Sequence, residues 1–239
     1  MVVKENSALR KARRSAGRRT RAGGAGQGPR GAFCLDRQGG SGHKNYGRIF
    51  MLKPFYQGKL DTFCAIYAVL NALRLTHSIR VLKAREILND TLMALAASPA
   101  AFRAALEQET DYCDLVDGML RTQSRIFPLD VRQPFGTDQD PSVDQVWDCF
   151  DQWLNGGGNR ALVFRFLRHL TPDGPPMNRH WTTADSLKNN VLRLFDCSHE
   201  AEAVLNVRKD SFVTSARDIC REKLLYIQPN TIRLMRLPL

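Results

Sequence analysis

The sequence predicts an α+β domain in which helices come first and an antiparallel sheet follows. An apolar run without Gly or Pro occupies 62–76, and two further helical patterns lie before residue 121. After residue 160, short β-branched and aromatic segments alternate with turn residues. This order does not fit alternating βαβ units, so we expect an α+β arrangement instead of a parallel sheet.

The first predicted helix, TFCAIYAVLNALRLT at 62–76, is apolar on nearly every side. Its large side chains form one stripe, and alanines and a valine cover the remaining faces. A helix without a polar face is buried, so we expect it to lie in the centre of the domain.

The other elements are predicted from periodicity and punctuation. Helices are expected at 81–97, at 99–121 with Pro99 in the first turn, and at 142–154 with Ser142 as the cap and a stop at Asn155-Gly156-Gly157-Gly158. A short extended piece is expected near 125–132. Strands are expected at 161–170, at 180–187 and 191–198 around a Lys188-Asn189-Asn190 turn, and at 224–228 and 231–237 as a closing pair around Pro229-Asn230.

Charge divides the chain into a basic extension, 1–48, and a globular domain, 49–239. The extension has twelve basic and two acidic residues, a net charge of +10, whereas the remaining 191 residues have 23 and 22, a net charge of +1. The extension is rich in Arg and Gly and almost free of apolar residues, so we expect it to be disordered. The near-neutral domain lacks the basic footprint of a nucleic-acid-binding protein.

The role of the extension stays open among a solvated, dispensable segment, translation from Met51, an organelle transit peptide, and a tail that binds nucleic acid weakly and non-specifically. No apolar h-region follows the basic N-terminus, and no stretch approaches the ~18 apolar residues of a membrane span. We therefore expect a cytoplasmic protein without a membrane partner.

The six cysteines give no metal or disulfide pattern. They are widely spaced, without a CxxC pair, and Cys197-x-His199 is too tight for the usual zinc pairs. We expect no metal and no cofactor. A serine-nucleophile site is also disfavoured, because there is no GxSxG elbow.

Cys64 is the strongest candidate for a nucleophile. Asp61, three residues earlier, is expected to cap the helix, which places Cys64 in its first turn, where the helix dipole favours a thiolate. Gln57 precedes it in a turn, and its amide together with the Cys64 N–H would form a two-donor oxyanion hole. The alternative for Cys64 is a buried core cysteine.

His180 and Asp196 are the candidates for a general base and its orienting carboxylate. His180 begins one predicted strand and Asp196 ends the next, so a hairpin between them would bring the two side chains together. Trp181, beside the histidine, would shield the site from water. His169 and His199 are weaker candidates for the base, and ordinary surface positions on a hairpin are the alternative for both residues.

In this order, Gln57-x6-Cys64, the helix FCAIYAVLNAL, His180-Trp181 and Leu194-Phe195-Asp196 resemble the papain-like cysteine peptidase superfamily. The nearest likeness is to bacterial peptidases that cut bacteriocin leader peptides. The resemblance spans 55–198 and implies a papain-like fold, with a buried central helix packed on a C-terminal sheet. It implies Cys64 as nucleophile, His180 as base, Asp196 as orienter and Gln57 as oxyanion donor. Ala65 stands where many relatives have Gly.

We therefore expect a cysteine peptidase that cleaves a peptide or isopeptide-type amide in a peptide or protein substrate, through a thioester acyl-enzyme. One alternative is an acyltransferase or transglutaminase-like enzyme on the same Cys-His-Asp site. Another is an inactive relative that binds a peptide or a protein partner.

Overall fold

The computed structural model describes residues 52–58, 61–107, 109–198 and 204–238. The predicted extension, 1–48, lies outside these residues. So do His199 and Met51, the alternative start of translation. Within the described residues the chain is an α+β domain with five α-helices and one sheet of mostly antiparallel strands, as expected.

The helices and strands follow one another in the predicted order. The helices are α1 (Cys64–His77), α2 (Val81–Ala96), α3 (Pro99–Leu106), α4 (Cys113–Gln123) and α5 (Val143–Leu154). The strands are β1 (Asp130–Arg132), β2 (Arg160–His169), β3 (Pro176–Lys188), β4 (Val191–Leu194), β5 (Asn206–Arg208), β6 (Phe212–Val213), β7 (Leu225–Ile227) and β8 (Arg233–Arg236).

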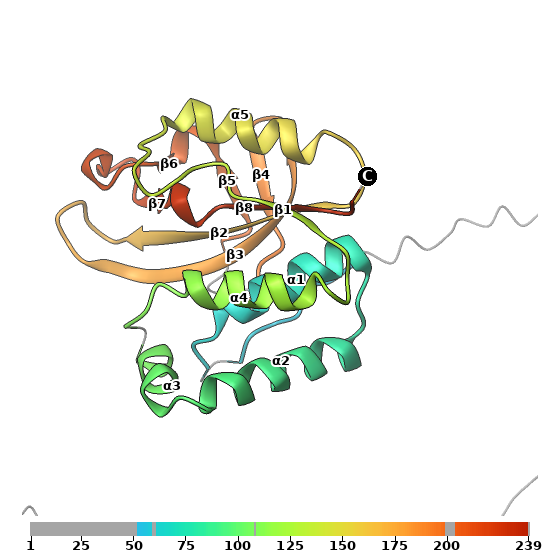
Figure 1. Cartoon of the computed structure of the whole chain (residues 1–239). Helices are drawn as coiled ribbons and strands as arrows, with labels where there is room; N and C mark the ends of the chain where they lie inside the picture. The colour runs from blue at the N-terminus through green and yellow to red at the C-terminus, as the bar shows by residue number, and fades with distance from the viewer. Residues whose placement is uncertain (1–51, 59–60, 108, 199–203, 239) are drawn as a thin grey trace, which may run out of the picture. The chain divides into compact units, whose positions relative to one another are not determined.

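The sheet separates two layers of helices. Its strand order is β1-β8-β2-β3-β4-β5, with β7 paired to β2 and to β6. Helices α1 to α4 lie on one side of it and α5 lies on the other (Figure 1). Two apolar cores fill these layers, and successive residues of β2 contribute to them alternately: Ala161 and Val163 to the α1 side, Leu162 and Phe164 to the α5 side.

The buried central helix is confirmed. Ten of the fourteen residues of α1 are buried, and α1 contacts both β2 and β3, the two long strands in the middle of the sheet. A helix that is apolar on every side is stable only if other elements pack against all of its faces. Around α1 these elements are α2, α4 and the sheet.

The helix predicted at 99–121 is wrong in one respect, because two helices replace it. Pro99 does begin α3, but that helix ends at Leu106 and α4 starts at Cys113. Side chains in the intervening segment start the new helix: the Asp111 carboxylate accepts the Cys113 N–H at 2.9 Å, and the Thr110 hydroxyl accepts the Tyr112 N–H at 3.2 Å. Tyr112 itself adopts a left-handed backbone, with φ of 63°.

The closing pair predicted around Pro229-Asn230 is also wrong. Strands β7 and β8 pair with β2 and not with each other, β8 along its first half and β7 along its second. A 3-10 turn at Pro229–Thr231 joins them, and the Thr231 hydroxyl accepts the Arg165 N–H at 2.9 Å. The two strands therefore continue along the same edge of β2. Strands β5 and β6, of three and two residues, were not predicted.

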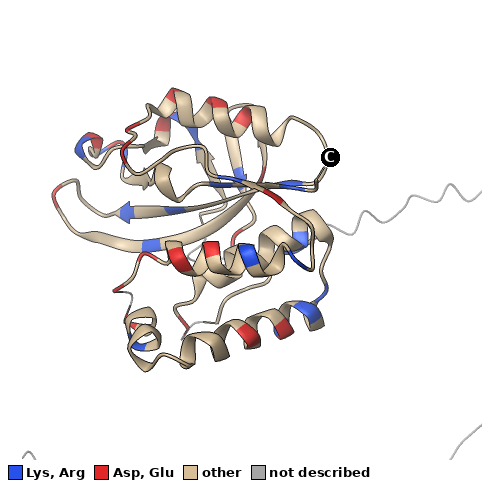
Figure 2. Cartoon of the chain, viewed as in Figure 1, with Lys and Arg blue, Asp and Glu red and all other residues tan. Residues whose placement is uncertain are grey.

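Charge on the domain is mixed. Basic and acidic residues occur on both helices and strands, and neither sign is confined to one layer (Figure 2). No helix among the described residues is long and apolar enough to cross a membrane.

Candidate active site

Cys64 is the first residue of α1, where its sulfur meets the sheet. The Trp181 N–H, on β3, points to the Cys64 sulfur at 3.4 Å. The side chain keeps only a small exposed fraction, 7% for the whole residue. The next residue, Ala65, is fully buried, so its methyl group belongs to the core and does not line the surface.

Asp61 does not cap α1 in the predicted way. Its carboxylate accepts the N–H groups of Gly58 at 2.8 Å and of Phe63 at 3.3 Å, which stabilises the turn before the helix. Phe63 is the N-cap, without a side-chain bond. The Cys64 N–H consequently has no acceptor among the described residues, as is usual for the first turn of a helix.

His180 and Asp196 are adjacent, as the hairpin prediction requires. The Nε2 atom of His180 lies 3.0 and 3.2 Å from the two Asp196 carboxylate oxygens. The turn between the strands has Asn189 and Asn190 in the left-handed region, with φ of 52° and 57°, typical of a tight hairpin. One detail differs from the prediction: β4 ends at Leu194, so Asp196 lies just after the strand.

The Asp196 carboxylate has further partners that fix its position. The Thr182 hydroxyl donates to it at 3.0 Å and the Ser198 N–H at 2.6 Å. Burial would raise the pKa of Asp196, but the hydrogen bond and charge of His180, with the Ser198 bonds, lower it below its ordinary value. An ionised carboxylate therefore faces the imidazole.

The His180 ring also interacts with Cys64. Burial would lower the pKa of His180, but its hydrogen bonds with Asp196, Cys197 and Cys64 and the Asp196 charge raise it well above its ordinary value. Because Asp196 contacts Nε2, the nitrogen left for the Cys64 sulfur is Nδ1. The Trp181 N–H, next to His180 in β3, holds the Cys64 sulfur, so Cys64, His180 and Asp196 lie in one buried cluster.

Gln57 reaches the same cluster through Cys197. The Gln57 N–H donates to the Cys197 carbonyl at 2.8 Å, and the Gln57 Oε1 atom accepts from the Cys197 thiol at 3.6 Å. Its Nε2 donates one hydrogen to the Asp61 carbonyl, which leaves the second N–H of the amide available. All four predicted site residues are therefore brought together.

Sequence reasoning did not predict Cys197 and Ser198 as site residues. The Cys197 sulfur lies 3.9 Å from His180 Nε2, and the Ser198 hydroxyl lies 3.3 Å from the same atom. Burial raises the pKa of Cys197 to about 11, although its interactions with His180 oppose this, so it remains a neutral thiol at pH 7. The sequence signal that could have identified them is their position directly after Asp196, because residues adjacent to a site residue in the chain also lie close to the site.

One group of donors in the described residues is close enough to hold a metal: His180, Asp196 and Cys197, with donor atoms within 4.8 Å of one another. Residues outside this group already engage two of its members: the Cys197 thiol donates to Gln57 Oε1, and Asp196 accepts from Thr182 and Ser198. The high pKa of Cys197 also disfavours the thiolate that a metal would bind. A hydrogen-bonded cluster suits these residues better than a metal centre.

The other described histidines lie elsewhere. His77 ends α1, at the opposite end from Cys64, and its ring contacts the Thr76 hydroxyl at 2.9 Å. His169 lies at the end of β2, 3.0 Å from the Gly174 carbonyl. His180 is the described histidine that joins Cys64 and a carboxylate.

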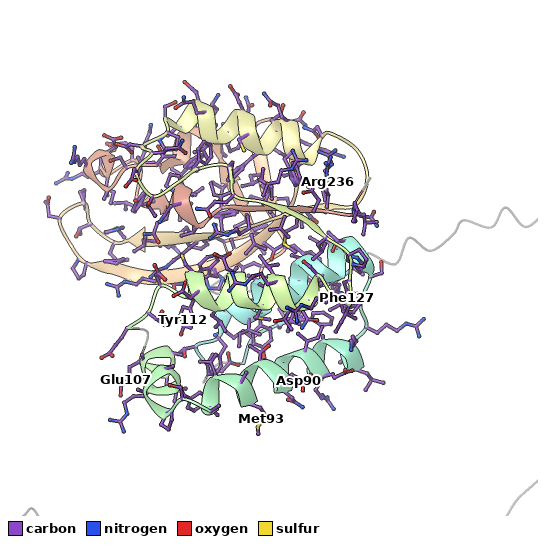
Figure 3. The ribbon with its side chains drawn as sticks, in the orientation of Figure 1. Asp90, Met93, Glu107, Tyr112, Phe127 and Arg236 are labelled. Carbon is purple, nitrogen blue, oxygen red and sulfur yellow. The ribbon has the colours of Figure 1, made fainter. Side chains whose placement is uncertain are left out.

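Tyr112 anchors the start of α4 beside the start of α1. Its hydroxyl donates to the carbonyl oxygens of Thr62 and Ala105, and its side chain lies at the end of the helical layer near Glu107 (Figure 3). The Trp181 indole N–H donates to the Asp111 carbonyl at 2.9 Å, which ties the same segment to β3. The wall around Cys64 is thus fixed by polar contacts between α1, the segment before α4, and β3.

No protein-family model matches the chain, and no curated protein matches it either.

Proposed function

We propose that the chain is a cysteine peptidase, which cleaves a peptide or isopeptide-type amide through a thioester acyl-enzyme on a papain-like fold. The observation that supports it is the single buried cluster of Cys64, His180 and Asp196, with the nucleophile at a helix N-terminus. A nucleophile, a base within reach and a carboxylate that orients the base are the parts that acyl transfer to sulfur needs.

The chemistry proceeds in two steps. In the first, His180 holds the proton from Cys64, and the sulfur attacks the carbonyl carbon and forms a C–S bond. The tetrahedral intermediate collapses, the C–N bond breaks, and His180 gives the proton to the leaving amine. In the second, His180 takes a proton from water while the water oxygen bonds to the thioester carbon. The C–S bond then breaks, the carboxylic acid leaves, and His180 returns the proton to the Cys64 sulfur.

The oxyanion of each tetrahedral intermediate would be held by two donors. The Cys64 N–H has no acceptor among the described residues, and one N–H of the Gln57 amide is uncommitted. Donors fixed in advance stabilise the developing charge without reorganisation. Cys197, which holds the Gln57 amide oxygen, orients that donor.

The arrangement of elements supports the papain-like proposal as well. A long central helix with the cysteine in its first turn packs against a hairpin that supplies the histidine and then the carboxylate. Gln57, Cys64, His180 and Asp196 occur in the chain order of that superfamily.

The proposal is tested by trapping the acyl-enzyme. We expect p-nitrophenyl acetate to release a burst of nitrophenolate equal to the enzyme present, with the acetyl group found on Cys64 by peptide mass spectrometry. A mixed peptide library should then show cleaved amide bonds. The Cys64→Ala variant should lose both activities, and Cys149→Ala, a half-buried cysteine of α5, should keep them.

Two outcomes would contradict the peptidase. Cleavage that survives in Cys64→Ala, or an acetyl group on another residue, would exclude Cys64 as nucleophile. Capture of the acyl-enzyme by an added amine in preference to water would show an acyltransferase on the same triad.

A further inference from the structure

Arg165 is a mostly buried cation that forms no ion pair with a described residue. Only 8% of the residue is exposed, and no hydrogen bond joins its guanidinium to the described part of the chain. The Arg165 backbone N–H donates to the Thr231 hydroxyl and the carbonyl accepts the Gln228 N–H, so neither contact uses the side chain. A buried charge that lacks a partner is costly, and proteins generally pair it or use it to bind a ligand.

Arg233, on the neighbouring strand, is a buried arginine that does have an ion-pair partner. Arg233 is equally buried, lies across from Val163 in β8, and forms a fork with the two Asp117 oxygens at 2.7 and 2.9 Å. Both arginines belong to the face of the sheet that α1 and α4 cover. Among the described residues, a carboxylate is therefore bonded to Arg233 and none is bonded to Arg165.

Arg165 lies next to the nucleophile. It is directly opposite Trp181 in the β2–β3 pairing, and the Trp181 N–H is 3.4 Å from the Cys64 sulfur. Burial lowers the pKa of Arg165, while the charges of Asp111 and Cys64 act in the opposite direction. Asp111 is exposed and acts on Arg165 through its charge, without forming an ion pair with it; one of its carboxylate oxygens accepts the Cys113 N–H.

A second arginine of β3 lies near Arg165 and lines a cavity. Arg179 is diagonal to Arg165 across the two strands and lines a cavity of about 300 Å³ with Leu106, Glu107, Pro176 and Met177. Glu107, the residue after α3 (labelled in Figure 3), also lines this cavity and places an acidic group in the same lining as Arg179.

We propose that Arg165 binds a carboxylate of the substrate beside the bond that Cys64 attacks. This rests on the proposed thiol chemistry and adds a substrate class to it: peptides with an acidic side chain or a free C-terminal carboxylate next to the scissile bond. A guanidinium presents paired N–H donors that match a carboxylate, and a dry site strengthens that contact. The bound substrate supplies the bonded carboxylate that the described residues do not.

The test compares two alkylating reagents of the same shape, anionic iodoacetate and neutral iodoacetamide. The rate of each on Cys64 of the full chain is measured by peptide mass spectrometry, with N-acetylcysteine as the reference thiol. We expect the iodoacetate-to-iodoacetamide ratio to fall about tenfold in Arg165→Gln, the loss of one charge-assisted contact. Arg168→Gln, on the opposite face of β2, should keep the wild-type ratio.

The ratio separates this inference from the proposed function. Equal ratios in the wild type and Arg165→Gln would overturn carboxylate binding, while fast labelling of Cys64 by both reagents would leave the thiol chemistry intact. A Cys64 that reacts with neither reagent would overturn the proposed function and this inference with it.

Stability provides a second measurement. Because no described residue bonds the Arg165 guanidinium, Arg165→Met should unfold at the wild-type temperature or above it, whereas Arg233→Met leaves Asp117 without its cation and should unfold at a lower temperature. A fall in Arg165→Met as large as that in Arg233→Met would assign Arg165 to the fold and overturn the proposal.

The source of the carboxylate is identified by protection of Cys64 from iodoacetamide. N-acetylglutamate α-amide offers a side-chain carboxylate, N-acetylalanine offers an α-carboxylate, and N-acetylglutamine α-amide offers neither. Protection by one of the acids, lost in Arg165→Gln, supports the proposal and identifies the source. Equal protection by the neutral amide, or protection by none of the three, contradicts it.

Discussion

At the scale of single residues, Gln57 provides a test that separates acyl transfer from simple thiol reactivity. We expect Gln57→Ala to slow acylation by p-nitrophenyl acetate about 10²–10³-fold, because the oxyanion loses a donor. Alkylation of Cys64 by iodoacetamide develops no oxyanion and should stay within about twofold of the wild-type rate. Parallel losses in both reactions would show that Gln57 only maintains the structure.

Loss of His180 should reduce activity more than loss of Asp196, because in the proposed mechanism His180 transfers the proton and Asp196 orients its ring. We expect His180→Ala to lower kcat/KM on the order of 10⁶-fold and Asp196→Ala about 10⁴-fold. Peptide cleavage or ester acylation measured for both variants checks the order. Wild-type rates in both variants would remove the pair from the site.

The four catalytic candidates were predictable because each carries a local signal: a cysteine at a helix start, a glutamine in the preceding turn, and a histidine and an aspartate on adjoining strands. Arg165 carries no such signal. It lies in an apolar strand, ALVFRFLRHL. Only the structure shows that the Asp117 carboxylate pairs with Arg233 and not with Arg165. Whether a buried charge has a partner depends on tertiary contacts that no short segment contains.

At the scale of elements, the segment that carries Gln57 is held by a buried asparagine of α1. The Asn71 side chain accepts the Phe55 N–H at 2.7 Å and donates to the Phe55 carbonyl at 3.2 Å. This two-way contact fixes the backbone two residues before Gln57. It also explains a polar residue in a helix that is otherwise apolar on nearly all sides.

We expect Asn71→Ala to lower the free energy of unfolding by about 1–3 kcal/mol and to slow ester acylation, while alkylation of Cys64 is largely kept. The matched control is Thr76→Val, a buried polar residue at the other end of α1, whose hydroxyl bonds the Ala72 carbonyl. If acylation in Asn71→Ala is no slower than in Thr76→Val, the Asn71–Phe55 hydrogen bonds do not position Gln57.

The predicted elements that differ from the structure differ for physical reasons. Hydrogen bonds from the backbone to the Thr110 and Asp111 side chains compete with helix continuation, so helical periodicity over 99–121 does not guarantee one helix. Strands β7 and β8 were expected to pair because they are adjacent in sequence. The 3-10 turn between them and the open edge of β2 determined the pairing instead.

At the scale of the whole molecule, the His180–Asp196 pair links stability to pH. The pKa of His180 is raised above its ordinary value near 6.5, so its contribution is fully present below about pH 6.5 and is lost as the pH rises through the folded-state pKa. The pKa of Asp196 is lowered, so its contribution is present above about pH 4 and is lost below it, as the pH falls through the folded-state pKa.

We therefore expect the stability advantage of the wild type over His180→Gln to be flat between about pH 4 and 6.5 and to shrink above it. Urea unfolding at a series of pH values measures this difference. An advantage that grows from pH 6.5 to pH 9 would reverse the sign and contradict the buried imidazolium–carboxylate pair.

The central claim, that Cys64 is a nucleophile activated by His180, is tested most directly by brief iodoacetamide labelling of the full chain at pH 6. An ordinary thiol, with a pKa of about 8.5, is less than about 1% thiolate at that pH. We predict that peptide mass spectrometry finds Cys64 modified well before Cys113, Cys149, Cys197 and Cys220. In His180→Ala, labelling of Cys64 should slow sharply at pH 6 and much less at pH 9. Labelling of Cys64 no faster than the other cysteines, with no effect of His180, would contradict the account.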